Sequence, residues 1–281
     1  MRRGRYHLTS LLRILSETQK LSFTWIESVC FYVVCSLPMA FAALNVVQQV
    51  VVDNETTFDA YGRNVSSIAR IIFNFVESSL WGFIYPTSVN LIVLLYCFLC
   101  RNFCRQINRI TRDIRECRVQ NFTLSKQANI SAQEARIGDL LHLTQRVFSV
   151  PSFLISAAHF CSCITVLGSL IVDSSTYAKN YTLLCQLVLL FLNGSVGLLA
   201  CLWTAGGLPL AEDQMKVVFR RKMRERLHLF GKVDEECFQK ELMQKPSFLI
   251  SGCLIVYFQR SSILTLLGTI LTYTILLVTK A

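Results

Sequence analysis

Residues 258–281 read FQRSSILTLLGTILTYTILLVTKA, an apolar run in which small hydroxyl residues recur at helical spacing. At about 100° per residue these positions fall on one stripe of a helix, and aliphatic residues cover the other faces. The stripe can reflect tight packing against neighbouring membrane helices, or a helix that lines a water-filled pathway. It comprises Ser262, Thr265, Thr269, Thr272 and Leu276, with Thr279 at its outer edge.

Two parts of this segment, residues 267–273 and 275–278, resemble the last helix of the arthropod gustatory receptor family. The family pattern is Thr-Tyr, a short apolar run, then Gln-Phe. Thr272 and Tyr273 keep the first half of the pattern, whereas Thr279 and Lys280 occupy the Gln-Phe positions. The resemblance extends upstream over residues 246–252 and 256–262, is specific over about 235–278, and is architectural elsewhere.

The resemblance implies a seven-helix receptor of the plasma membrane with its N-terminus inside and its C-terminus outside. It further implies a ligand-gated cation channel in which four related subunits, identical or not, place their last helices around a central pore. The ligand would be a small-molecule tastant or another chemical. We predict that this chain corresponds to family helices three to seven, as a short form or as an incomplete gene product.

The composition independently indicates a polytopic membrane protein. Of the 281 residues, 53% are hydrophobic and 16% are charged, which is too apolar for an ordinary soluble domain. The net charge of +10 is concentrated in the segments between apolar runs, as membrane topology predicts. We therefore expect contact with the lipid bilayer and no nucleic-acid partner.

The apolar runs predict an all-α membrane helix bundle with five spans. Because basic residues precede the first span and follow the second and fourth, the predicted orientation is N-terminus in and C-terminus out. We expect one transmembrane domain over residues 1–281, with cytoplasmic helical segments at 101–147 and 206–247. The predicted spans are about 29–52, 71–100, 148–172, 183–204 and 258–279.

Acceptor sequons in the two predicted external loops favour glycosylation at Asn54, Asn64 and Asn180. Further sequons at Asn121 and Asn129 fall in a predicted cytoplasmic segment. We interpret these two as chance matches.

Glu77 is an acid well inside the second predicted span, where a carboxyl costs about 2.5–3.5 kcal/mol and marks a cavity or a partner. On a continuous helix it shares one face with Trp81 and Tyr85 at i, i+4 and i+8. One interpretation is a wall of a ligand-binding pocket. The other is an aromatic interface stripe in which a neighbour satisfies Glu77.

No residue set matches a catalytic constellation or a metal site, so we expect no enzyme activity, no metal and no cofactor. His159 in the third span is interpreted as an interhelical residue rather than a ligand. A ligand-gated channel is the favoured function. The alternatives are a receptor coupled to a cytosolic transducer, a transporter, and a non-conducting subunit that acts through a partner.

Overall fold

The computed structural model describes residues 24–52, 59–60, 63–64, 67–172, 180–231, 248, 250–253 and 256–279. In this part of the chain the secondary structure is almost entirely helical, with two short antiparallel strand pairs. The strand pairs are β1 (Asp59–Ala60) with β2 (Arg63–Asn64), and β3 (Ser251–Gly252) with β4 (Val256–Tyr257). The predicted all-α membrane helix bundle is confirmed.

Among the described residues, four helices are long and apolar enough to cross a membrane, judged by length and composition. They cover Trp25–Gln48, Ile68–Glu116, Leu124–Val172 and Tyr181–Phe230. The fifth predicted span is a shorter apolar helix, α10 (Arg260–Val278). Its 19 residues correspond to about 28 Å, close to the ~30 Å of a hydrocarbon core.

Helix α2 (Trp25–Val52) begins four residues before the predicted start of the first span. The backbone N–H of Thr24 donates to the Glu27 carboxylate at 2.8 Å, which is half of a capping box. The signature Thr-x-x-Glu was present in the sequence. It fixes the start of α2 better than the hydropathy of the run does.

The second predicted span is not one continuous helix, and in this respect the prediction is wrong. Helix α3 (Ser67–Gly82) passes into a π-helical turn, η1 (Phe83–Thr87), before α4 (Ser88–Glu116) continues. Tyr85 has extended dihedrals there, with φ −146° and ψ 125°. Pro86 explains the break, because proline has no N–H to donate and its ring clashes with the preceding turn.

The two remaining long helices run past the predicted spans. Helix α5 (Leu124–Val172) follows a short 3-10 turn, η2 (Val119–Asn121), and α7 (Tyr181–Ala205) leads into α8 (Gly207–Phe230). Gly231, with φ 61°, ends α8 by donating its N–H to the Leu227 carbonyl at 2.9 Å.

The chain divides into two compact units. Unit 1 comprises residues 96–154 and the described part of 201–263. Unit 2 comprises the described parts of 22–95, 155–200 and 264–281.

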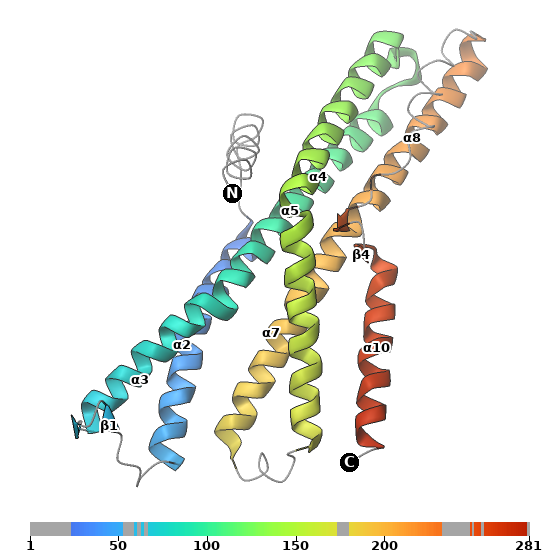
Figure 1. Cartoon of the computed structure of the whole chain (residues 1–281). Helices are drawn as coiled ribbons and strands as arrows, with labels where there is room; N and C mark the ends of the chain where they lie inside the picture. The colour runs from blue at the N-terminus through green and yellow to red at the C-terminus, as the bar shows by residue number, and fades with distance from the viewer. Residues whose placement is uncertain are drawn as a thin grey trace. The chain divides into compact units, whose positions relative to one another are not determined.

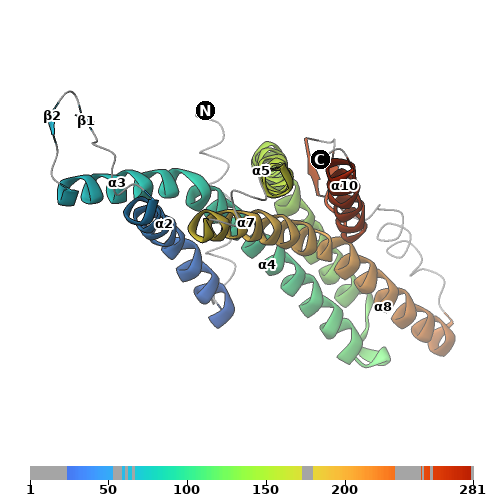
Figure 2. The same cartoon turned by 90° about the horizontal axis from the view of Figure 1, so that it is seen from below.

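In unit 1, parts of α4, α5 and α8 lie side by side (Figures 1 and 2). One face of α4 is buried at helical spacing, which is typical of an amphipathic helix. The rings of Phe122 and Phe219 pack edge to face at 5.4 Å, and Arg226 donates to the Phe122 carbonyl. The buried aliphatic and aromatic residues on the C-terminal half of α4 are Phe103, Ile107, Ile110 and Ile114.

In unit 2, α2 and α3 are held together by close packing and by a polar link. Gly82 is pressed against Pro38 of α2, because a Cβ at Gly82 would lie 2.9 Å from the Pro38 Cα. Asn45 of α2 donates to the Ser78 hydroxyl of α3 at 3.0 Å. Both contacts need small side chains on α3.

Candidate functional site

Four of the six residues predicted to line a pore carry hydroxyl groups that donate hydrogen bonds to backbone carbonyls of the same chain segment. In this arrangement the hydroxyl proton is satisfied locally, while the oxygen lone pairs remain available to accept from water or to face a cation. The bonds join Ser262 to Tyr257 (2.9 Å), Thr269 to Thr265 (2.9 Å), Thr272 to Gly268 (2.8 Å) and Thr279 to Leu276 (3.0 Å).

The faces of α10 are largely exposed in the single chain. Leu264 is 75% exposed, Leu271 61% and Leu276 53%, and a Cβ at Gly268 would meet no heavy atom within 4 Å. An apolar helix with this exposure requires partners, which a bilayer and further copies of the chain can supply. Lys280, the predicted rim residue, lies outside the described residues.

The start of α10 is seated in unit 1 at the junction of α7 and α8. Gly206 lies against the first α10 residue: a Cβ there would be 2.7 Å from the Arg260 nitrogen and 2.9 Å from the Leu202 carbonyl. The Arg260 guanidinium lies over the Trp203 ring at 4.3 Å from its centroid. The first residue of α10 is therefore in direct contact with the α7–α8 junction.

A second support in unit 1 joins α5 to the strand pair that precedes α10. The Gln145 amide donates to the Ser251 carbonyl at 2.5 Å and to its hydroxyl at 2.9 Å, and it accepts from the Ser251 N–H at 3.2 Å. The Ser149 hydroxyl accepts from the Cys253 N–H at 2.9 Å. Beside this network, the Tyr96 ring packs against Phe148 and Phe258.

Replacing Gln145 by alanine is expected to destabilise this support by about 1–3 kcal/mol, because Ser251 is buried and would lose its partners. Thermal unfolding of the purified chain in detergent measures the effect. Gln133→Ala is the matched control, since Gln133 is exposed on the same helix. An equal fall in melting temperature for both variants would contradict a specific role for Gln145.

Unit 2 contains amide side chains that link helices across the bundle. Asn45 accepts from Gln186 of α7 at 2.6 Å while donating to Ser78 of α3. The side-chain amide of Asn90 of α4 donates to the side-chain oxygen Oδ1 of Asn193 of α7 at 2.6 Å. The sequence analysis did not select these residues, although amides in apolar runs carry the same signal as Glu77, a polar group at membrane depth.

Of the three predicted ligand-contacting residues, Glu77 is the neighbour in sequence of Ser78, which belongs to this network. Glu77 is exposed, and Trp81 is 64% exposed. Because Tyr85 has extended dihedrals, the face predicted to join it with Glu77 and Trp81 does not continue through η1. Whether these three side chains contact a ligand stays a prediction.

His159 of α5 is fully buried against two glycines of α7 in unit 2. A Cβ at Gly197 would lie 2.9 Å from its Nε2 atom, and one at Gly194 would lie 3.3 Å from its carbonyl oxygen. The histidine thus occupies a notch where α5 and α7 approach closely. Among the described residues, no cluster of three His, Cys, Asp or Glu side chains could hold a metal ion.

These features define a multi-pass helical membrane protein with a separately exposed last helix. A sequence search finds no family model and no curated relative that matches. The chain is similar in structure to the insect olfactory receptor OR5 from Machilis hrabei in complex with eugenol. The TM-score is 0.68 at 15% identity, over 99% of this chain and 70% of that one.

A second structure, described simply as that of the same receptor, gives a TM-score of 0.66 at 15% identity with the same coverage. The resemblance to insect-type chemosensory receptors is therefore confirmed at the level of the fold. Assignment to the gustatory branch stays a prediction.

Proposed function

We propose that the chain is a subunit of a ligand-gated cation channel of the chemosensory, gustatory type, in which α10 lines the pore. The observation that carries this proposal is the exposed α10 helix, along which the hydroxyl groups of Ser262, Thr269 and Thr272 donate to nearby backbone carbonyls and keep their oxygens available to accept. Four copies around an axis would convert one such stripe into a continuous polar conduit. The proposed assembly combines identical or related subunits and resides in the plasma membrane.

The residues proposed to line the pore are those of the hydroxyl stripe, together with Thr279 at its outer edge. Leu276 is the apolar member, so a ring of four Leu276 side chains would close the pore by excluding water. Lys280 would add positive charge at the outer rim, where screening over about 8–10 Å limits its effect on cation entry. The lining residues are Ser262, Thr265, Thr269, Thr272, Leu276 and Thr279.

The proposed ligand is a small organic molecule with an aromatic or hydrogen-bonding group. The similar receptor was solved with eugenol, which has both features. Glu77, Trp81 and Tyr85 are the proposed contacts, and Glu77 precedes Ser78 of the amide network in the sequence. A shift of α3 or α7 on ligand binding would then move the α7–α8 junction, which contacts Arg260 at the start of α10.

A second candidate function is a non-conducting subunit that acts through a partner. The half-kept motif favours it, since Thr279 and Lys280 stand where the resembled family has Gln-Phe. Whole-cell recording separates the two candidates. The chain is expressed alone, with an upstream two-helix segment, or with a related subunit, and is challenged with a panel of small aromatic compounds.

Ligand-evoked cation current that requires this chain in any of these combinations supports the channel proposal. Surface delivery without current, or current unchanged when α10 is mutated in the presence of a partner, supports the non-conducting subunit.

The proposed orientation predicts glycans on one side only. Asn54, Asn64 or Asn180 should carry an N-linked glycan, while Asn121 and Asn129 should carry none. Asn180 precedes α7, where its side-chain oxygen accepts from the Leu183 N–H at 3.2 Å and leaves the amide nitrogen available. Asn54 lies outside the described residues, and only the backbone of Asn64 is described.

Glycosidase-sensitive mobility shifts of single Asn→Gln variants measure this. Loss of a glycan on replacing Asn121 or Asn129 would contradict the orientation.

A further inference from the structure

A groove of about 310 Å³ lies in unit 1 between the C-terminal half of α4 and the N-terminal half of α5. Its floor is apolar and buried, whereas its rim carries charged and amide side chains. The rim is formed by Gln106, Arg109 and Asp113 of α4 with Gln133 and Arg136 of α5, over a floor of Ile110, Ile137 and Leu140.

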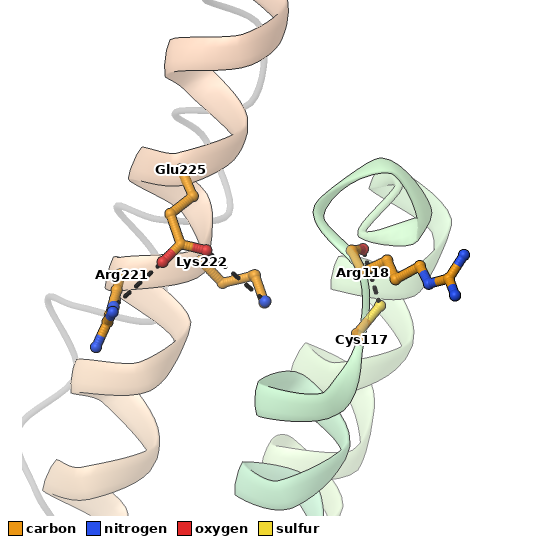
Figure 3. Close-up of polar contacts among 5 residues, drawn as sticks. All are labelled: Cys117, Arg118, Arg221, Lys222 and Glu225. Atoms are coloured by element: carbon orange, nitrogen blue, oxygen red, sulfur yellow. Dashed lines mark hydrogen bonds and ion pairs between the residues drawn. The ribbon is translucent and has the colours of Figure 1, made fainter.

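The charged groups of this rim have no partners in the described part of the chain. Neither guanidinium, Arg109 nor Arg136, forms a hydrogen bond or an ion pair there, and the Asp113 carboxylate is likewise unpaired. The basic cluster of α8 differs, because Glu225 contacts Arg221 at 3.1 Å and Lys222 at 3.7 Å (Figure 3). The groove therefore holds unneutralised charge of both signs around an apolar floor.

Each part of the groove matches one part of a phosphorylated polyol. Guanidinium groups bind phosphate oxygens in a bidentate manner, while a carboxylate and amides accept and donate to ring hydroxyls. The apolar floor suits the C–H face of a six-membered ring. A simple inorganic anion would form hydrogen bonds with the two arginines. It has no hydroxyl to donate to Asp113, so this carboxylate would only repel it.

We propose that this groove binds a phosphorylated polyol, such as an inositol phosphate or the headgroup of an inositol phospholipid. The inference uses the cytoplasmic position proposed for residues 101–147 and does not require channel activity. Arg109 is nine residues beyond Cys100, about 14 Å at the rise of a helix. A soluble polyol phosphate can bind at this distance from the end of the predicted span, whereas a lipid headgroup would have to extend away from the bilayer surface to reach it.

The test measures binding of inositol 1,4,5-trisphosphate, which keeps free ring hydroxyls, to the purified full chain in neutral phosphatidylcholine nanodiscs by titration calorimetry. Arg109→Gln and Arg136→Gln should each weaken binding about tenfold or more, since each removes a charge-assisted contact. Arg112→Gln is the matched control, because this exposed arginine of the same helix does not line the groove. It should change the affinity less than about twofold. Melting temperatures of all variants verify the fold.

Asp113→Asn separates a polyol site from a plain anion site. It should weaken binding of inositol 1,4,5-trisphosphate, which loses an acceptor for its ring hydroxyls, while tightening binding of inorganic pyrophosphate. A second arm adds phosphatidylinositol 4,5-bisphosphate to the nanodiscs: loss of the soluble ligand there assigns the site to the headgroup, and unchanged binding assigns it to the free compound.

Three results would overturn the proposal. They are no saturable binding in either arm, an equal loss in Arg112→Gln, and tighter binding of both probes to Asp113→Asn. Because the assay is independent of current, its failure leaves the channel proposal unaffected.

Discussion

Channels that carry Leu276→Ala are expected to conduct without ligand. The substitution removes three carbon atoms from each of four subunits in the proposed apolar ring, at about 0.8 kcal/mol per CH₂. A rise of at least about tenfold in ligand-free open probability should follow, because a wider and less apolar ring no longer excludes water. Holding current in the absence of ligand measures it.

Leu271→Ala is the control for this prediction. Leu271 is equally aliphatic and is 61% exposed, against 53% for Leu276, but it lies off the hydroxyl stripe. It should leave the ligand-free current near the wild-type level. A leak of the same size in both variants would indicate general loosening of α10 instead of an opened gate.

Gly206→Ala is expected to impair opening while leaving the protein at the cell surface. The added Cβ would lie 2.7 Å from the Arg260 nitrogen and 2.9 Å from the Leu202 carbonyl, and neither backbone atom can yield without moving its helix. Overpacking of this kind costs about 1–3 kcal/mol, which would shift a gating equilibrium by about 5–150-fold. The dose response and the surface signal are measured together.

The neighbouring glycine provides the control, because a Cβ at Gly207 would meet its nearest atoms at 3.6 Å and 3.9 Å. Gly207→Ala should therefore behave like the wild type. Equal losses of current in the two variants would contradict a specific role of the α7–α8 junction in gating.

The helical membrane class was predictable because long apolar runs between basic segments have few other solutions. Helix starts and breaks were predictable only where local chemistry was taken into account. Thr24 and Glu27 signal the start of α2, and Pro86 signals the break before α4, yet hydropathy alone passes over both. The helical interpretation of Tyr85 was wrong for this reason.

The supports of α10 could not be predicted from local patterns. Gln145 and Ser251 are 106 positions apart, and nothing in either neighbourhood indicates that they pair. The contact of Gly206 with Arg260 is equally non-local. In the structure α7 ends at Ala205 and α8 begins at Gly207, so Gly206 separates the two helices and also allows the close approach of Arg260.

The most direct test of the account asks whether the hydroxyl stripe of α10 faces the ion pathway. Cysteine is introduced at Thr272 on the stripe or at Leu271 off it, and current is recorded before and after a cationic methanethiosulfonate reagent, with the unmodified chain as reference. We expect the reagent to block most of the current through Thr272→Cys channels and to change the current through Leu271→Cys channels little. Block confined to Leu271→Cys, or no block of Thr272→Cys in channels that still conduct, would contradict the account.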